Sequence, residues 1–336
     1  MANLYLTEQN SILRKSGDRL IVQKDDETLL EVQCHKIDAV LIFGNVQFTT
    51  QAVHELFQHG IELAILTRTG KLIGQITSPT TKNITLRIQQ FKKYEDNDFR
   101  LSLAKAIVTA KLKNSLAVIR LFSFNHQGVG DGFETEVNAL KARINNVEAM
   151  TLIEQLMGLE GSAASTYFSA FSKMILGDEF SFPGRKKHPA PDPVNALLSL
   201  SYTMIFNEIS SLLDGLGFDP YLAYCHSIDY GRASLASDLM EEFRAPIADR
   251  LVLNLINNRI LKQEDFYSTP KDSGVYLKRE PLKRYFVEYE CTMNREFIHP
   301  DTKEKTAFRK CFRLQAERLA LTIQNNSPYL PFLLEV

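Results

Sequence analysis

A histidine and two carboxylates in the second half of the chain have the spacing of a metal-binding cluster. His226 follows a turn rich in Gly and Pro, and the next segment predicts a helix that is capped by Ser234 and carries Asp238 and Glu241. Because these acids are three residues apart, they share one helix face, close to the histidine of the preceding turn. The other positions of the segment are largely apolar: Ile228, Leu235, Leu239, Met240 and Phe243. The acids therefore have little structural purpose there, and clustered negative charges favour a counter-ion.

The donor types in this cluster favour a hard divalent cation, Mg²⁺ or Mn²⁺. Such ions prefer oxygen ligands, and an imidazole nitrogen shifts the preference toward Mn²⁺, whereas zinc fits less well with so many carboxylates. An ion of this kind can hold a phosphoryl oxygen, activate a hydroxyl group or water, and stabilise a leaving oxygen. Each feature alone is more often structural, a solvated helix face or a core histidine. The combination favours phosphodiester chemistry.

Glu160 is a further acidic candidate, on a predicted helix among the small residues of the segment 156–165. Small neighbours allow a second helix or a phosphate backbone to approach closely, although the segment alone is typical of a helix-packing surface with an exposed glutamate. Local basic patches in the same part of the chain could bind phosphate. They include Lys111, Lys113, Arg185, Lys186, Lys187, Arg232, Arg244 and Arg250.

Several other kinds of chemistry are disfavoured by the sequence. The Gly-rich segment 128–132 lacks the strand and the lysine of a phosphate loop, so we exclude a nucleotide-hydrolysing enzyme. There is no nucleophile elbow, which argues against covalent acyl chemistry. The four cysteines are spaced too widely for a disulfide framework or a paired-cysteine zinc motif.

The elements that would position these residues indicate an α+β protein of two domains. Residues 1–85 contain short runs of branched residues, such as 19–23, 39–43 and 62–66, with one short helix capped by Thr49 and a closing hairpin at 72–76. In residues 86–336 the apolar residues recur with a period of about 3.6, whereas in residues 1–85 the period is about two. We therefore predict a small N-terminal β-sheet domain with one short helix and a larger all-α C-terminal catalytic domain, joined near residues 78–83.

The composition is that of an ordinary soluble protein. The 336 residues carry 39 basic and 40 acidic side chains, so any nucleic-acid binding must come from local patches. The first residues lack the order of a signal peptide, and no apolar run is long enough to span a bilayer. We expect a cytoplasmic location and no membrane partner.

The motifs resemble those of the CRISPR-associated spacer-acquisition integrases, in the family's order and over nearly the whole chain. The matching segments are 158–164, Gly-Leu-Glu-Gly-Ser-Ala-Ala; 192–199, Asp-Pro-Val-Asn-Ala-Leu-Leu-Ser, with Tyr202; His226-Ser227; and 231–244, Gly-Arg-Ala-Ser-Leu through Asp-Leu-Met-Glu-Glu-Phe-Arg. The N-terminal part is also similar to the family's β-domain, with Gly44, the short helix and the hairpin from Gly70 to Gly74.

This resemblance implies a metal-dependent DNA endonuclease and integrase that inserts captured DNA segments into a CRISPR array. A terminal 3′-hydroxyl of the incoming DNA would attack a phosphodiester at the repeat boundary. The implied metal ligands are Glu160, His226 and Glu241, with Asp238 as an additional ligand or a supporting group. The site residues expected around them are Tyr167 and Asn195 as orienting groups, and Arg232, Arg244, Lys186 and Lys187 as phosphate-binding groups.

The family resemblance also implies partners. These are double-stranded DNA (the captured segment and the CRISPR repeat), a second copy of the chain bound through the β-domain, and a small ferredoxin-like CRISPR-associated protein that completes a heterohexamer. Two other hypotheses remain open on the residues alone. One is a structure-selective nuclease that uses the same metal, with water as nucleophile, on branched DNA or RNA in repair. The other is a non-catalytic DNA-binding scaffold with structural carboxylates.

Overall fold

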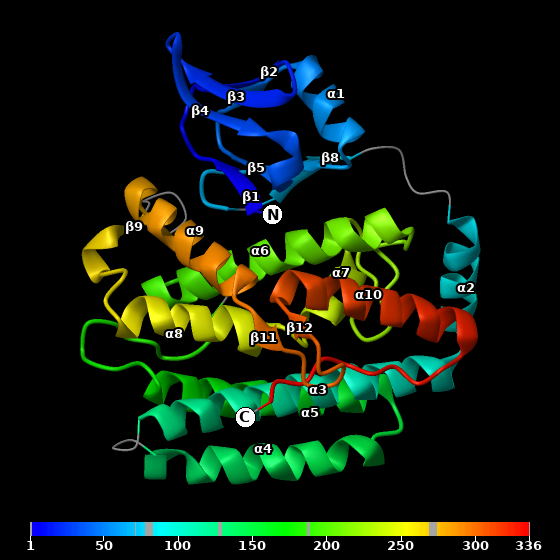
Figure 1. Ribbon diagram of the computed structural model, residues 1–336. Coiled ribbons are helices and arrows are strands. Elements are labelled where there is room, and N and C mark those ends of the chain that lie inside the picture. The colour runs from blue at the N-terminus through cyan, green and yellow to red at the C-terminus, as the bar shows by residue number, and fades with distance from the viewer. Residues whose placement is uncertain are drawn as a thin grey trace. The chain divides into compact units, whose positions relative to one another are not determined.

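The structure is a computed structural model that describes residues 2–70, 72–77, 83–126, 130–186, 189–268 and 274–335 (Figure 1). The chain divides into two compact units, Met1–Thr80 and Thr81–Val336, which are described separately below. The predicted linker falls almost entirely outside the described residues; of it, Asn83 is described and caps the first helix of the second unit, accepting a hydrogen bond from the Leu86 amide at 3.3 Å.

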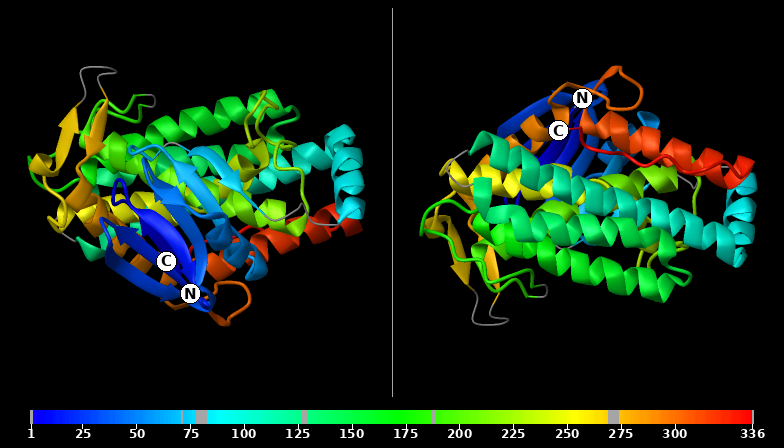
Figure 2. Two further views of the ribbon diagram at one scale, coloured as in Figure 1. Left: turned by 90° about the horizontal axis from the view of Figure 1, so that it is seen from above. Right: turned by 90° about the horizontal axis from the view of Figure 1, so that it is seen from below.

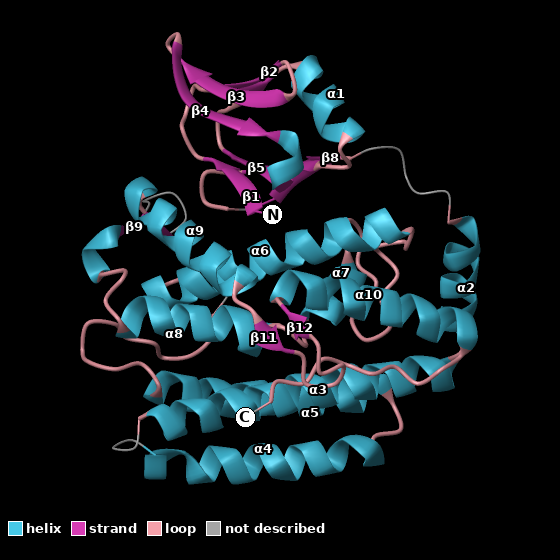
Figure 3. Cartoon of the chain, viewed as in Figure 1, coloured by secondary structure: helices cyan, strands magenta, loops and turns pink. Residues whose placement is uncertain are grey.

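The N-terminal unit consists of two four-stranded sheets and one short α-helix (Figure 3). The strand orders are β1-β5-β7-β8 and β4-β3-β2-β6. The bounds are β1 Ala2–Leu6, β2 Ile12–Ser16, β3 Arg19–Lys24, β4 Glu27–Gln33, β5 Ile37–Phe43, β6 Gln47–Phe48, α1 Thr50–Gln58, β7 Glu62–Leu66 and β8 Leu72–Ile76.

The sequence patterns of this unit have direct structural counterparts. Strand β5 is parallel to both β1 and β7, which explains why its residues form a nearly continuous apolar run. The predicted hairpin is confirmed, because β7 and β8 pair in antiparallel register. The predicted cap of α1 is also confirmed, since the Thr49 hydroxyl accepts a hydrogen bond from the Ala52 amide at 3.2 Å.

The second unit is predominantly helical. Helices α3, α4 and α5 pack against one another, and in the remainder of the unit α6 packs against α7, α8 and α10 (Figures 1 and 2). The helix bounds are α2 Ile84–Glu95, α3 Asn97–Asn125, α4 Glu134–Asn146, α5 Ile153–Lys173, α6 Pro193–Leu216, α7 Ser234–Met240, α8 Arg250–Asn257, α9 Arg279–Asn294 and α10 Phe308–Asn325.

The expectation that this unit is all-α is wrong in detail. Two short antiparallel strand pairs occur in it, β9 Phe266–Ser268 with β10 Val275–Leu277 and β11 Phe297–Ile298 with β12 Lys305–Thr306. Strands of two or three residues are too short to show the alternating pattern on which a strand prediction depends. The coarse α+β description, a β-sheet region followed by a helical region, is confirmed.

Helix α6 corrects a second expectation, because it is long and apolar enough by length and composition to span a membrane. Its charged residues are Glu208 and Asp214. More than half of its most apolar window is buried inside the unit, where the helix packs against α7, α8 and α10. The side chain of Asp192 caps its N-terminus, and Pro193 is its first residue. The helix is terminated by Gly217, whose φ of 96° is a left-handed conformation that glycine adopts without strain. It is the central core helix of this unit.

Candidate metal centre and phosphate pocket

Three elements of the helical unit bring the predicted metal ligands together. Glu160 lies on α5, His226 lies in the loop between α6 and α7, and Glu241 directly follows α7. All three line one pocket of about 930 Å³. The small residues around Glu160 have a role in this arrangement, because Gly161, Ala164 and Ser165 also line the pocket and leave room in it.

Glu241 lies where the helical backbone is interrupted. The chain turns after Met240 and forms a π-helical turn, Arg244–Asp249, before α8 begins. Pro246 explains the interruption, since it has no amide hydrogen to donate to the carbonyl of Glu242 four residues earlier. The Asn114 side chain of α3 donates a hydrogen bond to that carbonyl instead, at 2.7 Å. Such turns are frequent at functional sites.

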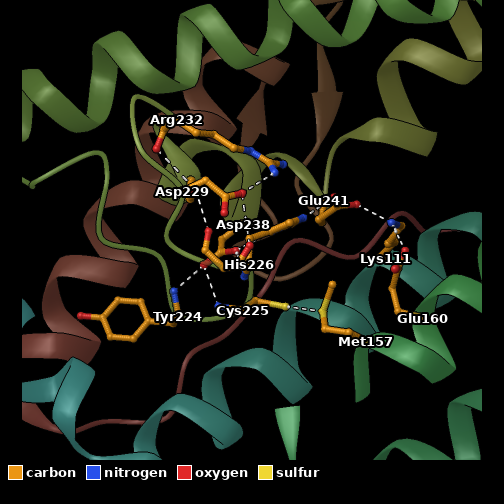
Figure 4. Close-up of polar contacts among 12 residues, drawn as sticks. Lys111, Met157, Glu160, Tyr224, Cys225, His226, Asp229, Arg232, Asp238 and Glu241 are labelled. Carbon is orange, nitrogen blue, oxygen red and sulfur yellow. Dashed lines mark hydrogen bonds and ion pairs between the residues drawn. The ribbon is translucent and has the colours of Figure 1, made fainter. Parts of the chain in front are cut away.

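Asp238 holds the loop that carries His226. It is 1% exposed, and its Oδ2 accepts hydrogen bonds from the backbone amides of Tyr224 and Cys225, at 2.7 and 3.0 Å. Its Oδ1 accepts a bond from the His226 amide at 3.0 Å and lies 2.7 Å from the imidazole Nδ1 (Figure 4). The imidazole tautomer that carries its proton on Nδ1 can donate to this oxygen, and in that tautomer Nε2 has the lone pair. The lone pair of Nε2 is thereby available for a ligand.

The free imidazole nitrogen is oriented toward the next carboxylate. Nε2 of His226 lies 3.7 Å from Oε1 of Glu241.

The prediction that Ser234 caps α7 is wrong. The N-cap residue is Ala233, and the Ser234 hydroxyl donates a hydrogen bond to the carbonyl of Ser227 at 3.0 Å. A serine hydroxyl donates as readily as it accepts, and here it fixes the loop beside His226.

Glu241 is a buried carboxylate surrounded by cations. It is 5% exposed. Arg244 Nη2 lies 3.1 Å from its Oε1, and Lys111 Nζ lies 2.7 Å from its Oε2. Burial alone would raise the pKa of Glu241, but Arg244, Lys111 and His226 lower that pKa to about 2. Glu241 is therefore ionised at neutral pH.

The Lys111 ammonium group also contacts Oε1 of Glu160, so one cation joins the two predicted carboxylate ligands (Figure 4). Oε2 of Glu241 is buried and makes no hydrogen bond, although Nζ of Lys111 lies 2.7 Å from it as an ion-pair partner. A buried carboxylate oxygen without a hydrogen bond, a second carboxylate and an imidazole nitrogen fit a hard divalent cation.

A second set of donors near this place fits a metal less well. Among the residues that the structure describes, donor atoms of Cys225, His226 and Asp238 lie within 4.8 Å of one another. Burial raises the pKa of the Cys225 thiol well above its usual value, and the thiol contacts the sulfur of Met157 at 3.4 Å. Both oxygens of Asp238 already accept hydrogen bonds. Burial therefore disfavours the Cys225 thiolate in this set, and both oxygens of Asp238 are committed to hydrogen bonds.

Tyr167, which was expected to orient groups at the site, is buried beside Asp249, a carboxylate that was not among the predicted site residues. Its hydroxyl donates to Oδ2 of Asp249 at 2.8 Å, and the Tyr202 hydroxyl donates to Oδ1 at 2.6 Å. Tyr202 lines the pocket, whereas Tyr167 is not among the lining residues. The guanidinium groups of Arg244 and Arg185 lie 5.0 and 5.3 Å from the centre of the Tyr202 ring. Tyr202 thus supports two arginines at the pocket.

Asn195 acts on the pocket through a loop. Its Oδ1 accepts hydrogen bonds from Arg185 Nη1 at 2.8 Å and from the Lys186 amide at 2.9 Å. Its Nδ2 donates to the Gly184 carbonyl at 2.9 Å and to Asp192 at 2.7 Å. Asn195 is fully buried, and its bonds fix the backbone that presents Arg185 and Lys186 to the pocket.

The pocket is strongly cationic. Its lining includes two carboxylates, Glu160 and Glu241, and six basic side chains: Lys111, Lys173, Arg185, Lys186, Arg232 and Arg244. Of the predicted phosphate-binding residues, Lys186, Arg232 and Arg244 are therefore at the pocket, and Lys187 lies outside the described residues. A cationic pocket with two carboxylates and an open imidazole is typical of enzymes that use a divalent metal on phosphate esters.

Comparison with known proteins identifies the family. The chain matches the family model described as CRISPR associated protein Cas1 over residues 4–291, and it belongs to this family. It is 34% identical over 332 residues to the CRISPR-associated endonuclease Cas1 3 of Thermus thermophilus, covering 98% of this chain and 96% of the relative. It is 32% identical over 334 residues to the endonuclease Cas1 1 of Chlorobaculum tepidum, covering 98% and 97%.

Solved structures share the same fold. A Cas1 protein from Thermotoga maritima superposes with a TM-score of 0.81 at 20% identity and covers all of both chains. A chain of a Cas6-RT-Cas1–Cas2 complex superposes with a TM-score of 0.81 at 26% identity, covering 98% of this chain and 36% of that one. The predicted family is confirmed.

Proposed function

We propose that this chain is a divalent-metal-dependent DNA endonuclease and integrase of CRISPR adaptation, which inserts captured DNA segments into a CRISPR array. The observation that carries the proposal is the convergence of Glu160, the Asp238-oriented His226 and Glu241 in one cationic pocket, in a chain that belongs to the Cas1 family. Its Cas1 relatives are named as endonucleases.

The residues Glu160, His226 and Glu241 would hold Mg²⁺ or Mn²⁺ in this proposal. When bound, such an ion supplies polarisation of a phosphodiester and stabilisation of its leaving oxygen. Asp238 keeps the proton on Nδ1 and fixes the ring, which raises the basicity of Nε2. Asp238 is thus assigned an orienting role rather than that of a ligand.

The remaining residues bind and orient the DNA. Arg244, Lys186 and Arg232 line the pocket and would bind phosphates of the DNA, and Asn195 holds the loop of Lys186 in place. The 3′-hydroxyl oxygen of the incoming strand forms a new bond to phosphorus as the 3′-oxygen of the repeat strand leaves. One phosphodiester replaces another, so the protein needs no covalent intermediate. A direct role for Tyr167 stays a prediction.

The proposed partners are double-stranded DNA, a second copy of the chain bound through residues 1–85, and a small ferredoxin-like CRISPR-associated protein that completes a heterohexamer in the cytoplasm. The similar chain from the Cas6-RT-Cas1–Cas2 complex supports a Cas2-type partner. Light scattering of the separate proteins and of their mixture measures both assemblies. A purely monomeric chain that does not change mass in the mixture would contradict them.

A strand-transfer assay tests the function. Purified protein, with the Cas2-type partner, is incubated with Mn²⁺, a fluorescent short duplex and a supercoiled plasmid that carries a CRISPR repeat. We expect label covalently joined to the plasmid, and we expect Glu160→Gln to abolish joining. Glu154→Gln is the matched control, because Glu154 is an exposed residue of the same helix. Nicking without joining would instead support the structure-selective nuclease, and full activity of Glu160→Gln would refute the metal site.

A further inference from the structure

Lys111 occupies an unusual place for a lysine. It lies on α3, its side chain is 15% exposed, and its Nζ contacts one oxygen each of Glu160 and Glu241. Helix α3 contributes no predicted metal ligand. Figure 4 shows the ammonium group between the two carboxylates, which belong to residues far apart in the sequence.

We infer that Lys111 and the metal ion compete for the same two carboxylates, and that metal binding releases Lys111 to a phosphate of the DNA. This inference rests on the proposed function, because it takes Glu160 and Glu241 as metal ligands. Nζ contacts Oε2 of Glu241, the oxygen that receives no hydrogen bond.

The charge balance of the pocket explains why a competing cation is useful. The carboxylates of Glu160 and Glu241 repel each other in a partly buried site, where charge interactions are stronger than in water. Lys111 and Arg244 neutralise them and keep both side chains in place. A divalent ion added to these four groups makes the site positive, which favours a phosphodiester anion.

The side-chain type fits the exchange. A lysine ammonium group is a compact charge on a flexible four-carbon stem, so it can leave two carboxylates and reach a neighbouring phosphate. Arg244 contacts Glu241 on the other oxygen and is packed on the Tyr202 ring, so its guanidinium group is held in place. Lys111 is therefore the mobile cation of the pair, and Arg244 is the fixed one.

The alternative is a permanent structural ion pair. Competition predicts that loss of Lys111 strengthens Mn²⁺ binding, whereas a permanent ion pair predicts unchanged or weaker binding. We would measure Mn²⁺ binding to the metal-depleted protein by electron paramagnetic resonance and by calorimetry, for wild type, Lys111→Met, Lys113→Met and Glu160→Gln. Lys113 is the matched control, because it is an exposed lysine two residues further along α3. Competition predicts about tenfold tighter binding to Lys111→Met, since contacts with charged groups must no longer be broken.

The control variants separate the possible failures. Lys113→Met should bind Mn²⁺ as the wild type does, and Glu160→Gln should bind it more weakly. Unchanged or weaker binding by Lys111→Met, with Glu160→Gln weakened, overturns the competition while leaving the metal site intact. Equal binding by wild type and Glu160→Gln overturns the proposed metal site itself.

A second measurement uses the wild-type protein and so does not depend on a folded variant. Amine-reactive labelling followed by mass spectrometry gives the labelling rate of each lysine with and without Mn²⁺. We expect the labelling rate of Lys111 to rise when Mn²⁺ saturates the protein, while that of Lys113 stays constant. An equally protected Lys111 at saturating Mn²⁺ would show that the metal does not displace it.

Discussion

Replacement of Asp238 by Asn removes the group that orients the proposed histidine ligand. If Nδ2 of the new amide takes the place of Oδ2, the amides of Tyr224 and Cys225 lose the acceptor that the structure gives them at 2.7 and 3.0 Å. Hydrogen bonds to a charged group contribute about 1.5–3 kcal/mol each, so the two together correspond to a loss of about 3 kcal/mol or more in the free energy of unfolding.

The same change affects His226, because an amide group stabilises the ring orientation less than a carboxylate does. Loss of a carboxylate behind a metal-binding histidine typically lowers metal affinity or activity about 10- to 100-fold. Urea unfolding and Mn²⁺ titration of Asp238→Asn measure the two effects, with Asp229→Asn as the exposed control. A variant that unfolds within about 0.5 kcal/mol of wild type and binds Mn²⁺ normally would refute the orienting role.

Three further predictions concern the surroundings of the site. Asn195→Ala should raise KM for DNA about tenfold with a smaller change in kcat, because the loop of Arg185 is no longer anchored; a fall in kcat alone in a steady-state joining assay would contradict this. Burial raises the pKa of Asp249 to about 6, so the folded protein holds this proton more tightly than the unfolded chain does. The resulting contribution of Asp249 to the free energy of unfolding is present below about pH 4 and is lost as the pH rises to about 6. Urea unfolding across this range should show wild type weakening relative to Asp249→Asn, and parallel curves would count against it. Phe332→Ala should cost about 3–5 kcal/mol, because the ring is fully buried, whereas Leu333→Ala, half-exposed, should cost less than about 1 kcal/mol in the same assay; equal losses would contradict the packing argument.

The parts of the fold that local patterns encode could be predicted from the sequence. The branched runs of β3, β5 and β7, the threonine cap of α1 and the change to helical periodicity all depend on neighbouring residues. The strands β9 to β12 could not be predicted, because two or three residues contain no periodicity. The sequence did not show a long apolar helix at α6, because Asn, Ser and Thr residues interrupt its apolar residues although they add no charge.

The candidate site, too, could be predicted only in part. The spacing of Asp238 and Glu241 indicated a shared face near His226, and the structure places both acids beside that ring. Spacing alone could not predict which acid orients the histidine and which faces the pocket, because this depends on the path of three backbone amides around Asp238.

Few of the supporting residues could be predicted from the sequence. In the sequence Lys111 is one of several basic residues and Tyr202 is part of a motif, although a lysine within a largely apolar helix indicates a buried partner. Asp249 follows Pro246 in the π-helical turn, and its two tyrosine donors come from other helices. Contacts of this kind depend on tertiary packing rather than on local pattern.

The most direct test of the proposed metal centre is anomalous scattering from crystals of the protein soaked in Mn²⁺. The geometry predicts one strong peak within coordination distance of Glu160, of Glu241 and of Nε2 of His226, with Asp238 still bonded to Nδ1. A peak on Asp238 and Cys225 instead, or no peak in the pocket at saturating Mn²⁺, would contradict the proposed metal centre.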